Sequence, residues 1–215
     1  MTKERFGVAE LILREVCEMD PDDPEKSDTI CIDVSTLKRV IDAHISETDE
    51  RHGLDSDTRV CFYEQDFYVL SNFSSFNLVG GFYGSPQSDG ITFATSEHAY
   101  HWHKFQPTDS DLADAILFAP SAHDAFKLAE RNKVNRWDRW DEFKVEIMRD
   151  ILRAKVTQHE YVRRKLLATG DRELVENSWR DDFWGWGPTQ DGANMLGKLW
   201  MEIRAEIRAK DTPDN

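Results

Sequence analysis

The segment TSEHAYHWHKF, residues 95–105, concentrates side chains that can transfer a proton or hold a ligand. Three of the chain's seven histidines fall within six residues there, beside Glu97 and Lys104. Thr95 is a good N-cap, so the pattern predicts a helix with Glu97 in its first turn. At 100° per residue, Glu97, His101 and Lys104 lie near one stripe of that helix. The stripe indicates proton-transfer chemistry, although a carboxylate at this position can also serve only the helix dipole.

A metal site is not predicted. The spacing of His98, His101 and His103 does not match HExxH, and no second cluster of carboxylates and histidines stands out. The three cysteines are far apart and form no CxxC pair, which indicates reduced thiols. No apolar run approaches the roughly 18 residues of a membrane span, and the first residues do not resemble a signal peptide. These features predict a cytoplasmic protein with no membrane partner.

A lysine lies on the apolar side of a predicted helix that covers residues 143–156. By angle, Lys155 falls inside the apolar arc of this helix. The arc consists of Phe143, Ile147, Met148, Ile151 and Leu152. A lysine that faces the interior needs a partner carboxylate or a chemical task. The sequence leaves a structural ion pair and a role in the site both open.

The segment RDDFWGWGPTQDGAN, residues 180–194, is a glycine-rich loop before a predicted helix. It places Asp181 and Asp182 beside Trp184 and Trp186. Glycines let the backbone approach a ligand closely, and a helix start favours an anion such as phosphate. The pattern fits a ligand-binding loop, with residues 185–195 expected to hold a diphosphate, and it also fits a solvent loop with aromatic packing.

The elements that must hold these residues follow from the apolar spacing. Strands are expected over 59–73 and twice within 74–93, with turn residues between the latter two. Helices are expected over 96–105, over 111–132 in two pieces divided by Pro120, over 140–159, over 161–178 with an interruption at Gly170, and over 194–210. The predicted class is α+β: a mainly helical single domain with a small antiparallel sheet.

The charge is uneven along the chain. The formal net charge is −14, and residues 1–58 hold 16 acidic and 7 basic side chains, a net of −9. We therefore interpret 1–58 as an acidic N-terminal appendage, with short helices over 6–19 and 34–45, and 59–215 as the catalytic domain. An acidic chain is not expected to bind a long stretch of phosphate backbone. A small phosphorylated ligand in a local basic pocket stays possible.

Five motifs in order resemble the NADAR family, also called YbiA-like proteins. They are LSNFSSF, TSEHAYHWHKF, RWDEFKVEIMRDILRAKVTQH, LLATGDRELVE and DDFWGWGPTQDGANMLGKLWMEIR, and the resemblance covers about residues 60–208. The resemblance implies the YbiA-like fold and an N-glycosidase that hydrolyses the bond between ribose C1 and a nitrogen. One branch of the family acts on phosphorylated ribosylamino-pyrimidine intermediates of riboflavin synthesis, and another removes ADP-ribose from guanine in nucleic acid.

The resemblance also implies roles for single residues. Glu97 matches the catalytic glutamate of the family's SEH signature, and Asp181 matches the acid of its D-x-[YF]-W-G motif. The residues expected to be catalytic are Glu97, Asp181, Lys155 and Lys104. The residues expected to bind substrate are Asn72, Phe73, His98, Tyr100, His101, Trp140, Asp182, Trp184, Gly185, Gly187 and Asn194. Trp186 departs from relatives that have Asp there. No cofactor is expected.

These residue types fit two routes for breaking a ribosyl C–N bond. A carboxylate can stabilise the positive charge at C1 or activate water, while a general acid or hydrogen bonds help the base to leave. Alternatively, a lysine amine can capture the aldehyde of a ring-opened ribose as a Schiff base. A non-catalytic ADP-ribose reader is the competing class. The expected partners are ADP-ribosylated guanine, modified DNA with a short footprint and, for residues 1–58, an ADP-ribosyltransferase toxin.

Overall fold

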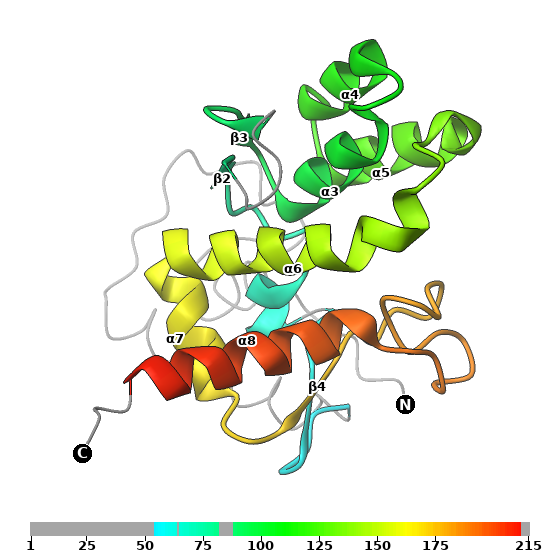
Figure 1. Cartoon of the computed structure of the whole chain (residues 1–215). Coiled ribbons are helices and arrows are strands. Elements are labelled where there is room, and N and C mark those ends of the chain that lie inside the picture. Colours follow the sequence, from blue (N-terminus) through cyan, green and yellow to red (C-terminus); the bar gives the residue numbers. More distant parts are fainter. Residues whose placement is uncertain (1–53, 64, 82–87, 212–215) are drawn as a thin grey trace, which may run out of the picture. The chain divides into compact units, whose positions relative to one another are not determined.

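The computed structural model describes residues 54–63, 65–81 and 88–211 (Figure 1). The chain divides after Gly53 into two units, and the second, Leu54–Asn215, carries every described residue. The predicted helices over 6–19 and 34–45 lie outside the described residues, and the division into 1–58 and 59–215 stays a prediction. No helix in the described ranges is long and apolar enough to cross a bilayer.

The described part is mainly helical with two small sheets, which confirms the predicted class. The elements are β1 (Arg59–Cys61), η2 (Gln65–Leu70), β2 (Leu78–Val79), β3 (Thr92–Phe93), α3 (Ser96–Phe105), α4 (Ser110–Leu117), α5 (Ala122–Arg131), η4 (Lys133–Asn135), α6 (Trp140–Gln158), α7 (Glu160–Ala168), β4 (Glu173–Val175) and α8 (Met195–Asp211). In Figure 1, α6 crosses between the group of α3, α4 and α5 and the long helix α8.

Side-chain caps fix where three of these helices begin. The Thr95 hydroxyl accepts the His98 amide at 3.3 Å, which confirms the predicted cap of α3. Asp109 accepts the amide of Leu112 at the start of α4, and Ser121 accepts the amide of Asp124 at the start of α5. Each cap satisfies an amide that has no partner inside its helix.

Two predictions about strands are wrong in detail. The strand predicted over 59–73 ends at Cys61, and the chain turns into η2, because Phe62 and Leu70 are drawn fully into the core. The segment predicted as helix after Gly170 instead forms β4, which pairs with β1 in parallel. Within the described ranges, the antiparallel pairing is that of β2 with β3. Gly170 has a φ of +60°, a conformation that ends α7 cleanly.

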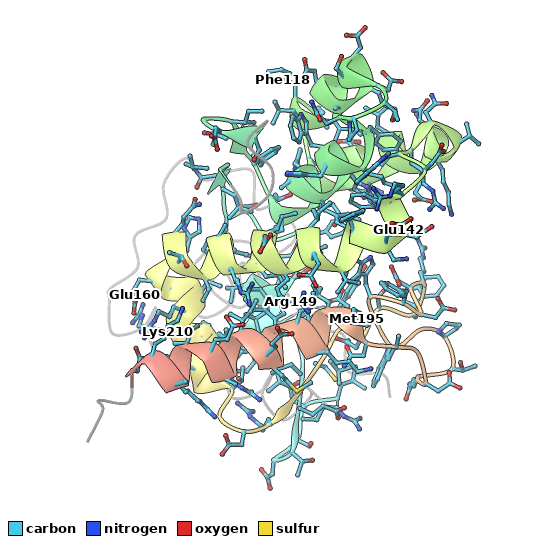
Figure 2. All side chains as sticks on the ribbon, in the orientation of Figure 1. Phe118, Glu142, Arg149, Glu160, Met195 and Lys210 are labelled. Carbon is cyan, nitrogen blue, oxygen red and sulfur yellow. The ribbon has the colours of Figure 1, made fainter. Side chains whose placement is uncertain are left out.

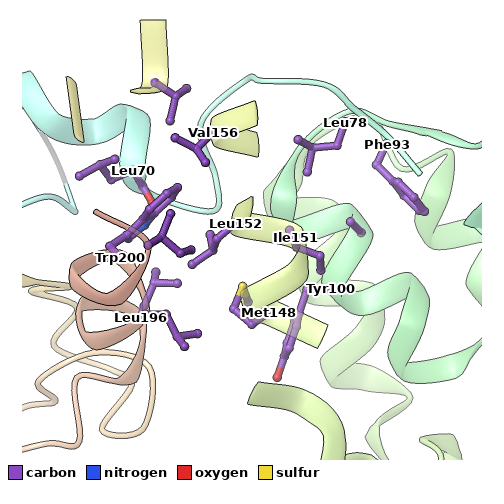
Figure 3. Packing of buried hydrophobic residues seen from close by; sticks show 14 of the residues in the cluster. Leu70, Leu78, Phe93, Tyr100, Met148, Ile151, Leu152, Val156, Leu196 and Trp200 are labelled. Carbon is purple, nitrogen blue, oxygen red and sulfur yellow. The ribbon is translucent and has the colours of Figure 1, made fainter. Parts of the chain in front are cut away.

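The core lies along α6 and reaches both neighbouring layers (Figure 3). Ile151 and Leu152 of α6 are fully buried, and Trp200 of α8 donates its indole N–H to the Leu70 carbonyl at 2.8 Å. Gly197 lets α8 approach β4, because a Cβ there would lie 2.0 Å from the Leu174 carbonyl oxygen. These contacts fix α8 against β4 and against the end of η2.

Charged side chains tie α6 to α8 at the surface. The guanidinium of Arg149, which Figure 2 labels on α6, contacts the Glu202 carboxylate of α8 at 3.0 Å. Arg153 pairs with Glu206 one turn further along. Exposed pairs of this kind each contribute about 0.2–1 kcal/mol, so they supplement the apolar contacts.

Helix α3 differs from an ordinary amphipathic helix because all ten of its residues are buried. Most of them are polar or titratable, and burial of such groups is costly unless they find partners. The sequence predicted a functional stripe on this helix. The structure surrounds the whole helix, so its polar side chains face either protein partners or a cavity.

Candidate functional site

A cavity of about 470 Å³ opens beside α3. Its lining comes from α3, α5 and its connection to α6, the first half of α6 and the segment 176–184, together with Tyr63, Asn72, Phe73 and Leu196. The volume lies in the range of small-molecule sites. Ten of the predicted site residues line this cavity: Asn72, Phe73, Glu97, Tyr100, His101, Lys104, Trp140, Asp181, Asp182 and Trp184.

Glu97 lies at the buried wall of the cavity and is 6% exposed. Its Oε1 atom is 2.9 Å from His101 Nε2, one helical turn further along α3. The Glu97 amide donates to the Asn72 carbonyl at 3.1 Å, which joins α3 to the segment after η2. Glu97 is therefore positioned by contacts of both its side-chain carboxylate and its backbone amide.

Three aromatic rings form a second wall. The centroid of the Tyr100 ring lies 4.9 Å from that of Trp140 and 5.5 Å from that of Trp184, both edge-to-face. The Trp184 indole N–H donates to the Tyr100 hydroxyl at 3.2 Å. Burial raises the pKa of Tyr100, so this hydroxyl keeps its proton across the neutral range. Figure 3 shows that hydroxyl pointing away from Ile151. Such a wall can hold a flat heterocycle.

Asp181 organises the loop that carries Trp184. Its Oδ1 atom accepts the amides of Phe183 at 2.9 Å and of Trp184 at 2.7 Å. These bonds close a tight turn and commit one carboxylate oxygen of Asp181 to the backbone. The predicted catalytic acid therefore also has a structural task.

The two predicted lysines occupy different places. Lys104 lines the cavity, and its Nζ atom lies 3.5 Å from Glu130 Oε1. Burial lowers the pKa of Lys104, and Glu130 opposes that change. Lys155 is fully buried and does not line the cavity. Its Nζ atom donates to the Ser71 carbonyl and to the Ser74 hydroxyl, both at 2.8 Å.

Burial lowers the pKa of Lys155 to about 7, and the Glu176 carboxyl opposes that change. Through Ser71 and Ser74, Lys155 fastens the segment that carries Asn72 and Phe73 into the cavity. The sequence left open a structural ion pair and a role in the site. The structure shows neither arrangement, because Lys155 donates its hydrogen bonds to a carbonyl and a hydroxyl. It has no ion pair within the described residues.

Four predicted binding residues do not line the cavity. His98 uses both ring nitrogens inside the protein, with Thr95 Oγ1 at 2.8 Å and the Ala119 carbonyl at 3.1 Å. Gly187 has a φ of +69° and supports a turn. Asn194 bonds to the backbone at the end of β4, and Gly185 packs against the same backbone. These residues shape the loop, and residues 185–195 do not form the cavity wall as predicted.

Glu176 is a cavity residue that the sequence reading missed. It directly follows β4, lines the cavity and is 7% exposed. Burial, followed by the charges of Glu97 and Asp181, raises the pKa of Glu176 to about 8, and Lys155 opposes this rise. Glu176 was not predicted as a site residue because the pattern of residues 161–178 indicated a helix. A strand at 173–175 would have marked the next residue as a strand-end carboxylate.

Five cationic side chains also line the cavity, and the one on α3, Lys104, lies about two turns from Glu97. These five side chains form the cationic rim: Lys104, Lys133, Arg136, Lys144 and Arg180. Glu130 pairs with Lys104 and Lys133, while Asp141 pairs with Arg136 at 2.7 Å and with Lys144 at 2.9 Å. The lining as a whole carries these five cations and six carboxyl groups, so the cations offer local contacts to an anionic ligand although basic groups are not in excess. In the described ranges, no group of three or more His, Cys, Asp or Glu side chains could hold a metal ion.

The fold and cavity define a helical α+β protein with buried carboxylates, an aromatic wall and a cationic rim. The sequence matches the family model described as NADAR domain over residues 61–208. The chain belongs to this family, and the resemblance drawn from its motifs is confirmed.

Relatives that are named N-glycosidases support the same assignment. The chain is 35% identical to the N-glycosidase YbiA of Escherichia coli over 154 residues, 70% of this chain and 89% of YbiA. It is 39% identical to an N-glycosidase of Nostoc punctiforme over 152 residues, 69% of this chain and 92% of that protein. A riboflavin biosynthesis protein of Vibrio vulnificus is 36% identical over 160 residues, 73% of this chain but only 42% of that protein.

The fold has a solved counterpart. The NMR structure of E. coli YbiA matches with a TM-score of 0.64 and 31% identity, covering 75% of this chain and 91% of that one. This match confirms the YbiA-like fold class.

Proposed function

We propose that this protein is an N-glycosidase that hydrolyses a ribose C1–nitrogen bond, and that its substrate is ADP-ribosylated guanine in nucleic acid. The observation that carries the proposal is the polarity of the cavity. Buried carboxylates lie around Glu97, and five cations form the rim. A ribosyl–base bond next to a phosphorylated chain has the matching order of charge: positive charge develops at C1, and negative charge resides on the phosphates.

The residues around Glu97 fit the chemistry of C–N cleavage. As C1 becomes positive in the transition state, the Glu97 carboxylate stabilises it or takes a proton from water. His101 orients that carboxylate through the 2.9 Å contact. Tyr100, Trp140 and Trp184 provide a surface on which the base can stack.

The rim predicts which ligands bind. ADP-ribose should bind more tightly than AMP, because it offers a diphosphate to the cations and a second ribose that reaches Glu97. Calorimetry with both ligands tests this, and equal or weaker binding of ADP-ribose would contradict it. The few cations at the rim agree with modified DNA that contributes a short footprint and a flipped base.

The deciding experiment measures turnover of two substrates. An oligonucleotide with ADP-ribosylated guanine should release ADP-ribose, detected by chromatography. Phosphorylated ribosylamino-pyrimidines represent the second candidate function, which is favoured by the name of the Vibrio relative. A higher kcat/KM for the pyrimidines than for the oligonucleotide would show that they, and not ADP-ribosylated guanine, are the substrate. Binding of ADP-ribose without any turnover would make the protein a reader.

A lysine route is tested by borohydride reduction during turnover. Lys104 lines the cavity, so it is better placed than Lys155 to capture a ribose aldehyde. Peptide mass mapping that finds a reduced ribose adduct on Lys104 would establish this route. Turnover that leaves no adduct supports the carboxylate route through Glu97.

The remaining partner is proposed for residues 1–58. Their net charge of −9 suits a basic surface, and we propose an ADP-ribosyltransferase toxin whose modification the enzyme reverses. Co-purification of the full chain with such a transferase, lost on deletion of the acidic segment, would support this interaction.

A further inference from the structure

Cleavage of a ribosyl–nitrogen bond needs a proton for the departing base, and the residues assigned so far do not supply it. Glu97 contacts His101 and acts on C1, which requires its carboxylate form. Asp181 Oδ1 accepts two backbone amides, an arrangement that calls for an acceptor and not a donor. Both carboxylates therefore have tasks in the ionised state, and the proton donor must be another group in the cavity.

Glu176 is a buried carboxyl group that lines the same cavity. Its backbone is fixed on both sides: its amide donates to Asn194 Oδ1 at 3.0 Å, and its carbonyl accepts the Trp186 amide at 3.0 Å. A Cβ at Gly185 would lie 2.7 Å from that carbonyl oxygen, so the loop packs tightly against it. The backbone of Glu176 thus has a defined position.

One carboxyl oxygen of the Glu176 side chain, in contrast, makes no hydrogen bond to the described part of the protein. This oxygen, Oε2, is buried, and no hydrogen-bond partner lies against it in the part of the chain that the structure describes. A buried polar atom without a partner is costly, and functional sites are a common place for one. The free oxygen belongs to a residue that faces the ligand space, so a ligand can complete its hydrogen bonding.

The groups around Glu176 favour its protonated form. Glu97 of α3 and Asp181 of the following loop add negative charge, and Lys155 of α6 is the opposing cation. On the side of η2, burial together with Tyr63 and Glu176 raises the pKa of Tyr68, so that phenol adds no charge near pH 7. Burial and the two carboxylates outweigh Lys155, and the pKa of Glu176 rises to about 8.

We propose that Glu176 is the general acid of the reaction and gives its proton to the base nitrogen that leaves C1. This role rests on the proposed N-glycosidase function. The C1–N bond breaks with its electron pair passing to the base, and the Glu176 proton makes the base neutral. Water adds its oxygen to C1 and gives one proton to Glu97. Transfer of that proton through solvent to the Glu176 carboxylate restores both groups, with ADP-ribose and the unmodified guanine of the oligonucleotide as products.

The test compares Glu176→Gln with Glu173→Gln. Glu173 lies on β4 three residues earlier, where its exposed carboxylate pairs with Arg59 at 3.3 Å, so it is a matched control outside the cavity. With an oligonucleotide carrying ADP-ribosylated guanine, Glu176→Gln should lower kcat by about 10²-fold or more, since general acids contribute about 10²–10⁴-fold. Glu173→Gln should keep the wild-type rate, and both variants should bind ADP-ribose as the wild type does.

The pH profile separates proton donation from a structural role. Wild-type kcat should fall as the pH rises through about 8, because Glu176 loses its proton there. The residual activity of Glu176→Gln should lack that limb, since glutamine does not titrate. An unchanged rate and an unchanged limb in Glu176→Gln would overturn the role. A joint loss of turnover and ADP-ribose binding would overturn it too, by indicating a structural effect.

The outcome for the wild type keeps the two proposals distinguishable. A wild-type protein that cleaves no ribosyl–nitrogen bond, in the oligonucleotide or in the ribosylamino-pyrimidines, overturns the proposed function and this role together. Wild-type turnover with an unaffected Glu176→Gln variant overturns only the role of Glu176.

Discussion

The two parts of the cavity hold their charges in opposite ways. The carboxyl groups of Glu97 and Glu176 are more than nine-tenths buried, whereas the side chains of the rim cations Lys133 and Arg136 are 60% and 35% exposed. Lys104 is a rim cation that is buried like the carboxyl groups. A buried charge interacts strongly with a nearby reacting atom because little water screens it. A solvent-exposed charge at the rim is screened by water and salt, so it contributes mainly to attracting and binding an anionic ligand. The buried part is thus suited to catalysis and the rim to recognition.

The largest expected effect belongs to the buried part. Glu97→Gln keeps the size of the side chain and removes its charge, so turnover should fall by about 10²-fold or more while ADP-ribose binding changes little. Single-turnover kinetics and calorimetry measure the two quantities. Glu142→Gln, at an exposed position of α6, is the control. If Glu97→Gln turned over at the wild-type rate, the buried part of the cavity would not be the catalytic part.

Substitutions at the rim should change the Kd for the ligand and leave kcat unchanged. Lys144→Ala removes a cation that lines the cavity, so the Kd for ADP-ribose should rise by about 10-fold, the effect of roughly 1.4 kcal/mol. The difference should shrink as salt increases, because the charge is partly exposed. Calorimetry at two salt concentrations measures it, with the exposed Lys127→Ala as control. A loss in kcat without a change in Kd would contradict the division.

Neither part of the cavity should need residues 1–53. A chain that starts at Leu54 should keep its fold and its turnover. A chain that starts at Arg59 loses the Asp55 carboxylate that accepts the Cys61 amide and the Thr58 carbonyl that accepts the Glu173 amide. Loss of two such bonds should lower Tm by roughly 5 °C. Thermal unfolding of both chains checks this, and loss of turnover in the folded Leu54 chain would show that the acidic segment completes the site.

The smallest expected effect is a gain in stability. The pKa of Glu176 is higher in the folded protein than in the unfolded chain, so its favourable contribution is complete below about pH 4.5 and is lost as the pH rises through about 8. Glu176→Gln avoids this loss and should raise Tm by about 4 °C at pH 8, with a smaller gain at pH 5. Scanning calorimetry at both pH values measures the difference. A variant that is less stable than the wild type at pH 8 would indicate that the Glu176 carboxylate is well paired in the fold.

Local patterns sufficed for most of the helices, although the segment after Gly170 is a strand. The Thr95 cap and the apolar spacing of 140–159 are short-range signals, and α3 and α6 begin and end close to the predicted bounds. Family motifs also marked ten residues that line the cavity, among them Glu97 and Trp140. Strands were predicted less well, because the pairing of β1 with β4 joins residues 114 positions apart, such as Arg59 and Glu173.

What the sequence by itself determined is the inventory: an N-capped helix with Glu97, an inward-facing Lys155 and a glycine-rich loop with Asp181. Tertiary structure decided which of these groups meet a ligand. It directed Lys155 to the Ser71 carbonyl, placed the glycines behind the cavity wall and brought Glu176 into that wall. Spacing along the chain fixes the face of a helix on which a side chain lies. The element packed against that face, and therefore burial, hydrogen-bond partners and pKa, depends on long-range contacts that no local pattern contains.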